Sequence, residues 1–345
     1  MEKLWIQNTV DDRRAMIEQA VLAHKGIAEQ AVEKDWWVTV ILRALFRCGC
    51  AGSLMFKGGT SLSKAWGVID RFSEDIDLAI SHSFFGIDKT TRSQKEKLRK
   101  LSRAYIHETL SRELDEQLWA MGVDGYRIEN KTHVKNRGDE LEPIDSDKDP
   151  TVILVHYPTI CKDLADYIPP VVKIEISCLS MDVPVQVRTI RSYIGETFPG
   201  EDEGTLGEYR TVVPSRTFLE KIFLLAEEFQ KARPRHVRMS RHLYDLERLM
   251  DTEFGRIALE DNWLYDAVVE HRRTYYALKY VDYDLHARST ISFLPPEELL
   301  PRWRDDYNNM IQSFIYGNAL AFDALMERMR ELQRRVNKNV NVEKL

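Results

Sequence analysis

The chain has 345 residues, of which 43% are hydrophobic and 30% charged, and its formal net charge is −6 at pH 7. These totals are ordinary for a soluble globular protein and allow two compact units. No stretch approaches the roughly 18 apolar residues of a membrane span, and residues 1–8 do not resemble a signal peptide, so we expect a cytoplasmic protein. The negative net charge argues against a protein that coats nucleic acids without sequence preference, although a local basic patch would still allow an RNA substrate.

Two helices are predicted in the first 50 residues. Residues 10–30 mix apolar and charged side chains at the spacing of an amphipathic helix, and residues 32–46 carry a broader apolar stripe that we expect to lie against a sheet. The acidic start of the second helix, Glu33-Lys34-Asp35, indicates a well-capped helix end.

The cysteines lack the spacing of a zinc site and predict free buried thiols; they are Cys48, Cys50, Cys161 and Cys178.

Residues 54–80 follow the order strand, glycine turn, helix, loop, strand. Gly58 and Gly59 end a short apolar run, and Thr60 and Ser61 are predicted to cap the helix that follows. A glycine pair at a helix start lets the backbone approach a phosphate, because its free N–H groups and the helix dipole favour an anion. This turn is therefore a candidate phosphate cradle.

A carboxylate pair follows the turn. Asp75 and Asp77 are two residues apart in a predicted strand, so they share one face while Ile76 and Leu78 occupy the other. Two adjacent carboxylates repel unless a cation neutralises them, and Mg²⁺ held by carboxylates and substrate phosphates is such a cation. Either motif alone is more often structural, but their order and separation indicate metal-assisted phosphoryl or nucleotidyl transfer.

The string from Lys57 to Leu62, followed by Arg71 to Leu78, resembles the AbiEii/AbiGii (MenT-like) nucleotidyltransferase toxin family of the polymerase-β-like nucleotidyltransferase superfamily. The resemblance runs from about Glu33 to Leu332 and implies an α+β fold, with a mixed sheet flanked by helices and a C-terminal helical domain. We expect a core in residues 1–210, with an insertion at about 82–150, and a helical domain in residues 211–345 that completes the active site. Glu33-Lys34-Asp35 also resembles a motif of this family. These three residues therefore have two interpretations, a capped helix end and a family motif.

The insertion matches no motif of the family. Residues 89–121 have helical spacing and begin with a basic run, for which a solvated helix face is the default and an RNA-contacting face the alternative. Residues 126–150 are predicted to be a surface loop, because the acidic cluster there lacks the glycine and glutamate of a calcium site.

Strands are predicted at residues 152–157 and 171–177. In the second, Lys173 and Glu175 share one face. A lone glutamate on a strand is usually an exposed sheet residue, but the superfamily resemblance implies that Glu175 is a third metal-binding carboxylate.

Residues 195–208 are rich in Gly, Glu and Asp and are predicted to be a linker or an excursion loop, and the rest of the chain to be helical. Between two predicted helices, from Ser215 and from Arg241, lies a basic stretch without an acidic residue. We expect an RNA backbone to follow its five cations, which are Lys231, Arg233, Arg235, Arg238 and Arg241.

The C-terminal part of the chain contains two further stretches that resemble motifs of this family. Lys221 lies in a helix that resembles the family's lysine motif, and Arg241 to Leu246 resembles its Arg-x-x-Tyr-Asp-Leu motif, except that His242 stands where an acidic residue often follows the arginine. The resemblance implies that Lys221 binds nucleotide phosphates and that Asp245 acts as a general base or orients the acceptor hydroxyl. On spacing alone, an ion pair between Asp245 and Arg241 would be the simpler interpretation.

The resemblance as a whole implies a toxin of a toxin–antitoxin or abortive-infection system used in phage defence. It would need Mg²⁺, with two ions expected, and a cognate antitoxin, and would move a nucleoside monophosphate from an NTP to an RNA acceptor such as the tRNA 3′ end, which blocks translation. Asp75, Asp77, Lys221 and Asp245 would be catalytic, and Asp75, Asp77 and Glu175 would bind the metal. The nucleotide-binding residues would be Lys57, Gly58, Gly59, Thr60, Ser61, Ser73 and Lys221.

Three alternatives stay open: a nucleotidyltransferase that modifies a protein or small molecule, an inactive binding module and a nuclease. Incubation with RNA and labelled NTP separates them, since the RNA would be extended, left unchanged or shortened.

Overall fold

A computed structural model of the chain describes residues 2–25, 27–87, 91–136, 139–161 and 168–338. The chain divides into two compact units. Unit 1 comprises residues 1–65 and 72–211, and unit 2 comprises residues 66–71 and 212–345. In the described part, no helix combines the length and apolar character needed to cross a membrane.

Unit 1 is built on a mixed sheet of seven strands in the order β3-β6-β7-β2-β1-β9-β8. Strand β2 pairs parallel with β7 and antiparallel with β1, which in turn pairs parallel with β9. A separate hairpin joins β4 to β5. The strands are β1 Leu54–Lys57, β2 Ile76–Ile80, β3 Arg127–Asn130, β4 His133–Lys135, β5 Leu141–Pro143, β6 Thr151–His156, β7 Val171–Ser177, β8 Val185–Ile190 and β9 Gly207–Val212.

Strands β6 and β7 alternate buried and half-buried side chains, because one face of this part of the sheet packs into the core. The buried positions of β7 include Val172, Ile174 and Ile176, and the half-buried ones include Lys173 and Glu175. Predicted strands at 54–56, 76–80, 152–157 and 171–177 are present as β1, β2, β6 and β7. The short strands β3 to β5 lie within the predicted surface loop at 126–150.

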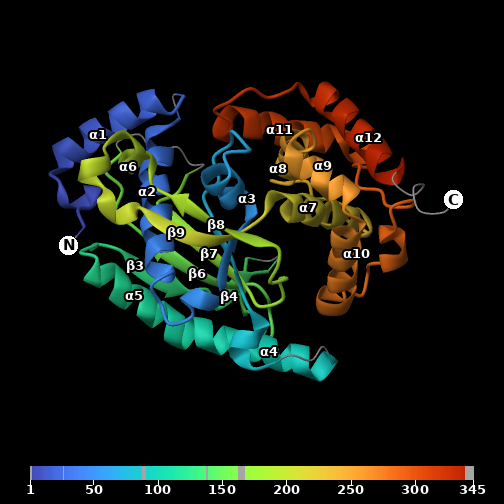
Figure 1. The fold of residues 1–345 in the computed structure, drawn as a ribbon, viewed down its shortest axis with the longest axis horizontal. Helices are drawn as coiled ribbons and strands as arrows, with labels where there is room; N and C mark the ends of the chain where they lie inside the picture. Colours follow the sequence, from blue (N-terminus) through green and yellow to red (C-terminus); the bar gives the residue numbers. More distant parts are fainter. Residues whose placement is uncertain (1, 26, 88–90, 137–138, 162–167, 339–345) are drawn as a thin grey trace. The chain divides into compact units, whose positions relative to one another are not determined.

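The helices of unit 1 lie around this sheet (Figure 1). Helix α2 contacts β7, α1, α5 and α6, which buries nearly all of it, including Trp36 and Trp37. Helices α4 and α5 are joined through a π-helical turn at residues 105–110, so the predicted helical stretch at 89–121 is one continuous run from Arg92. The bounds are α1 Val10–Ala23, α2 Glu29–Leu45, α3 Gly58–Thr60, α4 Arg92–Ala104, α5 Ser111–Ala120 and α6 Tyr193–Thr197.

Two predictions in unit 1 are wrong. Glu33, Lys34 and Asp35 do not form a helix end, because α2 begins one turn earlier, at Glu29, and all three side chains are buried. Of the two alternatives for residues 195–208, the linker is wrong, because the stretch leads from β8 into β9 of the same sheet. It contains helical turns around Asp202, a fully buried residue whose carboxylate accepts hydrogen bonds from the Trp5 backbone and the Trp36 indole.

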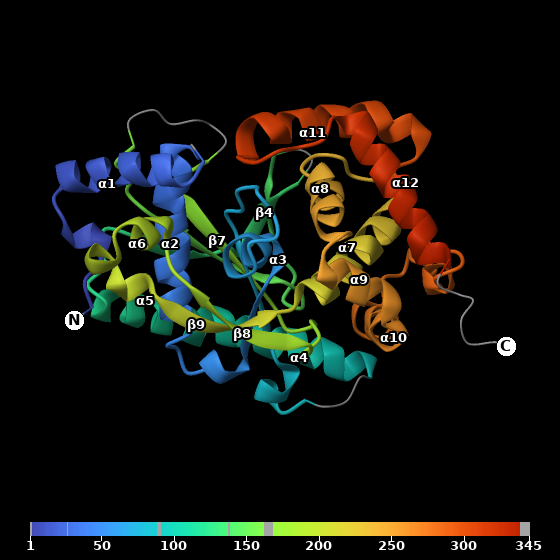
Figure 2. The ribbon, with the colours of Figure 1, turned by 45° about the horizontal axis from the view of Figure 1, so that its top comes forward.

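Unit 2 is helical, as its apolar spacing predicts (Figure 2). Helix α7 packs against α8, α9 and α10, and α8 also contacts α11 and α12. Proline at its first position starts α7, where a missing N–H costs nothing. The helices are α7 Pro214–Phe229, α8 Ser240–Leu249, α9 Glu253–Glu260, α10 Asn262–His271, α11 Leu300–Phe314 and α12 Phe322–Lys338.

The short segment 66–71 belongs to unit 2 although its neighbours on both sides in the sequence belong to unit 1. The Trp66 indole donates a hydrogen bond to the Val212 carbonyl, and its ring stands edge-on to Phe254. Asp70 pairs with Arg248 at 3.2 Å, and Arg71 forms a β-bridge with Ile315. Unit 2 therefore fixes the loop that separates the glycine turn from the carboxylate pair in the sequence.

Candidate active site

The glycine turn follows β1 directly and lies against the second carboxylate. Lys57 is the register partner of Asp77, and Gly58 has φ +78°. A Cβ atom on Gly58 would lie 2.0 Å from the Asp77 Oδ2, so only glycine allows this approach. The structure thus brings the turn and the carboxylate pair together within unit 1.

Thr60 and Ser61 stabilise the turn from within, and neither caps the helix. Helix α3 begins at Gly58 and has no side-chain cap, so the predicted capping role is wrong. Both residues are buried. The Thr60 hydroxyl donates to the Asp75 carbonyl and lies 2.9 Å from the Ser73 Oγ, and the Ser61 hydroxyl donates to the Gly58 carbonyl. These bonds tie the turn to the segment that carries the carboxylates.

Lys57 lies at the end of β1 and points along the sheet. Its Nζ donates a hydrogen bond of 2.9 Å to the Ser180 Oγ, and Ser180 follows β7. The ammonium group of Lys57 is thereby placed beside the strands that carry Asp77 and Glu175.

Two of the three predicted metal-binding carboxylates, Asp77 and Glu175, lie on neighbouring strands, and the third, Asp75, lies just outside the strand in which it was predicted. Asp77 is the register partner of Glu175, because β2 and β7 run parallel, and Asp75 immediately precedes β2. All three side chains are on the half-buried face of the sheet. Adjacent strands are about 4.8 Å apart, so the strand pairing sets the spacing of Asp77 and Glu175, whereas Asp75 extends from the segment that leads into β2.

Lys173 lies between two of these carboxylates, a contact that the sequence interpretation missed. Its Nζ is 3.2 Å from the Asp75 Oδ2 and 3.1 Å from the Glu175 Oε1. Partial burial would lower the pKa of Lys173, but the charges of Asp75 and Glu175 outweigh it and raise that pKa, so the ammonium stays charged. The alternation of β7 already put Lys173 and Glu175 on one face, which was the available signal.

The donor set suits a hard divalent cation. Carboxylate oxygens are the ligands that Mg²⁺ prefers, and two of these groups already hold a cationic group between them. As arranged, no cluster of three or more His, Cys, Asp and Glu side chains that could hold a metal occurs among the described residues. Asp75, Asp77 and Glu175 fit the ion chemically, and Lys173 is the group that it would have to displace.

Helix α2 makes two buried ion pairs, one with Glu74 beside the carboxylate pair and one with Lys64 in the helical turn that follows the glycine turn. The Lys34 Nζ lies 2.7 Å from the Glu74 Oε2 and also donates to the Pro169 carbonyl, while Asp35 pairs with Lys64 at 2.6 Å. Burial raises the pKa of Asp35, an effect that Lys64 opposes. Glu74 directly precedes Asp75, so Lys34 positions the backbone from which that carboxylate extends.

In unit 2 the predicted lysine and aspartate meet. The Lys221 Nζ lies 2.9 Å from the Asp245 Oδ2, and Arg71 makes a two-pronged pair with the same carboxylate at 2.7 and 2.8 Å. Asp245 is fully buried. Its partners are thus Lys221 and Arg71, and the role of Arg71, although the residue is part of the quoted motif, was not predicted.

The charges in this cluster shift the pKa values in opposite directions. Burial alone would raise the pKa of Asp245, but Arg71 and Lys221 outweigh it and hold that pKa well below the usual range. Burial lowers the pKa of Lys221 despite the attraction of Asp245. Burial and the neighbouring cations lower the pKa of His242 well below its usual value, so this histidine is neutral at pH 7.

The basic stretch carries less free charge than its sequence suggests. The buried Glu228 carboxylate, at the end of α7, binds both Lys231 and Arg235 at 2.7 Å. Arg238 is exposed, and its backbone N–H donates to Asp306. Arg233 is exposed as well. The five cations predicted to contact RNA therefore include two that are neutralised by one glutamate.

The chain matches the family described as Nucleotidyl transferase AbiEii toxin, Type IV TA system, over residues 40–328. The chain belongs to the AbiEii nucleotidyltransferase toxin family. It is therefore a nucleotidyltransferase of a type IV toxin–antitoxin system, and this membership implies an NTP substrate and an antitoxin partner. The match extends across the glycine turn, the carboxylate pair, Lys221 and Asp245.

Among solved structures, this AbiEii protein is similar to MenT4, a nucleotidyltransferase toxin from Mycobacterium tuberculosis H37Rv. The two chains are 17% identical, with a TM-score of 0.40, and the alignment covers 94% of this chain and 97% of MenT4. No curated protein matches the chain.

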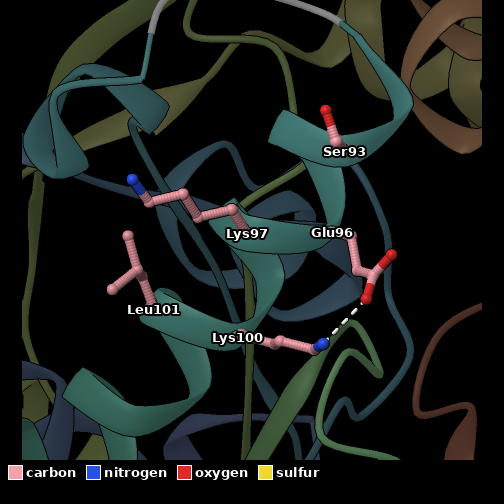
Figure 3. A pocket seen from close by; sticks show the side chains of 5 residues that line it. All are labelled: Ser93, Glu96, Lys97, Lys100 and Leu101. Atoms are coloured by element: carbon pink, nitrogen blue, oxygen red, sulfur yellow. Dashed lines mark hydrogen bonds and ion pairs between the residues drawn. The ribbon is translucent and has the colours of Figure 1, made fainter.

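One basic surface of this AbiEii protein lies outside the family motifs. A surface pocket on α4 is lined by Ser93, Glu96, Lys97, Lys100 and Leu101, all from one helix (Figure 3). Lys100 pairs with Glu96 at 2.7 Å, and the ammonium group of Lys97 extends away from that pair. The lining carries only this exposed ion pair and one further cation, which agrees with the default prediction of a solvated helix face.

Proposed function

We propose that this nucleotidyltransferase moves a nucleoside monophosphate from an NTP to an RNA acceptor, the 3′ end of a tRNA, and thereby blocks translation. The observation that carries the nucleotidyl chemistry is the contact between the glycine turn and the carboxylate pair, at Gly58 and Asp77. A phosphate held by the turn would lie next to carboxylate oxygens that suit Mg²⁺. The RNA acceptor is supported by the family resemblance and by the exposed arginines of the basic stretch.

In this proposal Asp75, Asp77 and Glu175 hold Mg²⁺. The ion would supply charge neutralisation at the phosphates and lower the pKa of the attacking hydroxyl. That hydroxyl oxygen forms a bond to the α-phosphorus and its proton passes to water, while the bond from this phosphorus to the bridging oxygen of the β-phosphate breaks and pyrophosphate leaves.

The backbone of Gly58 and Gly59 would bind the phosphates, assisted by the ammonium of Lys57. Thr60 and Ser61, whose hydroxyls are engaged within the turn, would keep it in shape. Ser73 is half-buried beside Thr60 and would donate to a phosphate oxygen.

We further propose that Lys221 contributes its charge to the triphosphate and that Asp245 positions Lys221. A carboxylate held between two cations, with a strongly lowered pKa, is a poor proton acceptor. This arrangement favours a positioning role for Asp245 over the general-base role. Arg71 would share that role, since it binds both oxygens of the carboxylate.

The test is a transfer assay with purified protein, total tRNA, Mg²⁺ and each α-³²P-labelled NTP in turn. We expect label on tRNA with one or two of the NTPs, and none with the Asp75→Ala/Asp77→Ala variant, whose fold is checked by circular dichroism. Activity in that variant would contradict the metal assignment. Label on protein or on a small molecule would discard the RNA acceptor and keep the chemistry, and no label anywhere would favour a binding module.

A further inference from the structure

Lys173 occupies the centre of the carboxylate site, and the proposed function gives its ammonium no role. Its Nζ bridges Asp75 and Glu175 at 3.2 and 3.1 Å. A divalent cation bound by the same oxygens would lie close to this positive charge and be repelled by it. The lysine and the ion therefore compete for the same carboxylates.

The surroundings of Lys173 make the carboxylates its natural partners. On the other side of β7, Leu154 of β6 is the register partner of Lys173, and Val152 is that of Glu175. Both neighbours are apolar, so the adjacent strand supplies no acidic group to hold the ammonium. On the β2 side, Asp75 and Asp77 supply carboxylates.

The side chains at this site are able to rearrange. The exposed fractions are 34% for Lys173, 18% for Asp75 and 31% for Glu175. Lysine carries its charge on a flexible four-carbon stem, so the ammonium has a path to water while the strand stays in place. Displacement then needs no change in the backbone of the sheet.

We propose that Lys173 is a built-in counter-cation, which holds Asp75 and Glu175 together in the metal-free protein and is displaced when a divalent cation binds. The inference rests on the proposed metal-binding role of these carboxylates. Two consequences follow. The charge of the carboxylates is partly neutralised and Asp75 and Glu175 are already held together before the metal arrives, and the affinity for the metal is lower than the three carboxylates alone would provide.

The test compares Lys173→Met with the unmodified protein. We expect Lys173→Met to bind Mn²⁺ at least about threefold more tightly, measured by electron paramagnetic resonance titration, because a repelling charge has been removed. Without metal we expect its Tm to fall, since the carboxylates repel, and added Mg²⁺ to raise that Tm by more than in the unmodified protein.

Two matched variants complete the design. Lys97→Met removes the same charge from an exposed position on α4 (Figure 3) and should leave the affinity for Mn²⁺ unchanged. Lys173→Gln guards against a folding defect, since it keeps a polar side chain of similar length and should also tighten binding.

The possible failures are distinguishable. If Asp75→Asn/Asp77→Asn binds Mn²⁺ as well as the unmodified protein, the metal assignment in the proposed function fails. If that variant loses Mn²⁺ but Lys173→Met and Lys173→Gln bind it equally or more weakly than the unmodified protein, the counter-cation role is wrong. A raised KM for NTP with unchanged Mn²⁺ affinity would identify Lys173 as a phosphate-binding group and likewise overturn the inference.

Discussion

At the scale of single residues, backbone conformation and burial decide what the candidate site can do. Gly58 combines a positive φ, which strains residues with a side chain, with a contact to Asp77 that leaves no room for a Cβ atom. Lys221 and Asp245 are buried as a pair, and burial lowers the pKa of the lysine. Each feature gives a prediction.

We predict that Gly58→Ala abolishes transfer and destabilises the protein. The added Cβ would lie 2.0 Å from the Asp77 Oδ2, so either the turn or the carboxylate must move. Gly86→Ala is the matched control, because Gly86 also has positive φ but open space around it. It should cost only about 1 kcal/mol of backbone strain and retain activity. Urea unfolding measures the stability of both variants, and the transfer assay measures their activity. Equal losses of stability and activity in the two variants would refute the contact between Gly58 and Asp77.

The alkaline limb of the pH profile should report Lys221. Burial lowers the pKa of Lys221, so its ammonium is lost on the alkaline side at a lower pH than that of an ordinary lysine. We predict that the KM for NTP rises as the pH passes through that value. In Lys221→Arg the guanidinium stays charged, so the rise should disappear, even if the overall rate is lower. An identical alkaline limb in both proteins would exclude Lys221 as its source.

At the scale of elements, the carboxylates are placed by the pairing of parallel strands and by helix α2. The register of β2 and β7 sets Asp77 opposite Glu175. Helix α2 is held by partners along much of its first half, including Thr159, whose hydroxyl donates to Glu33. The buried ion pair between Lys34 and Glu74 is weak evidence for net stability, because desolvation opposes the attraction between the two charges. Its clearer effect here is to place Glu74, and with it Asp75.

We predict that Lys34→Met alone destabilises the protein by about 3–5 kcal/mol, because it leaves Glu74 buried without its cation. The double variant Lys34→Met/Glu74→Leu should recover most of that stability. Its kcat should nevertheless stay low with little change in the KM for NTP, since Asp75 would no longer be held in place. The measurements are a double-mutant cycle in urea and steady-state kinetics. Full activity in the double variant would show that the pair has no positioning role.

At the scale of the whole molecule, the net charge of −6 disfavours binding to RNA except through local cationic surfaces. In the basic stretch, Glu228 neutralises Lys231 and Arg235, whereas Arg233 is exposed. The charge available to a phosphate backbone therefore depends on pairing within unit 2, and a count of cations in the sequence overestimates it.

We predict that Arg233→Ala weakens tRNA binding and reduces the slope of log Kd against log salt by about one. Lys231→Ala, whose charge is already engaged by Glu228, should change the slope much less. Fluorescence anisotropy with labelled tRNA at several salt concentrations measures both variants. Equal effects would mean that pairing with Glu228 does not limit access to phosphate, and no effect in either would remove this stretch from the RNA path.

The sequence by itself determined the elements whose signals are local. Strands β1, β2, β6 and β7 and the long helices follow from the spacing of apolar side chains, and the order of glycine turn and carboxylate pair pointed to the nucleotidyltransferase family. Strands β8 and β9 were missed. Strand β8 lies at the edge of the sheet, and β9 falls partly in a stretch whose Gly-rich and acidic composition resembles a linker. The short strands β3 to β5, within the predicted surface loop, were missed as well.

Only the tertiary structure decided which charges meet. Arg71 and Asp245 are 174 residues apart in the sequence, and Lys34 and Glu74 are 40 apart. The spacing of Asp245 and Arg241 suggested a local ion pair, whereas Arg71 and Lys221, which bind the Asp245 carboxylate, come from other segments of the chain. An ion pair within one helix is worth only a few tenths of a kcal/mol. A buried carboxylate without a cationic partner is strongly destabilising, so it pairs with cations that the fold brings close from any part of the chain. For that reason the partners of Asp245 and the place of Lys173 between two carboxylates became visible only in three dimensions.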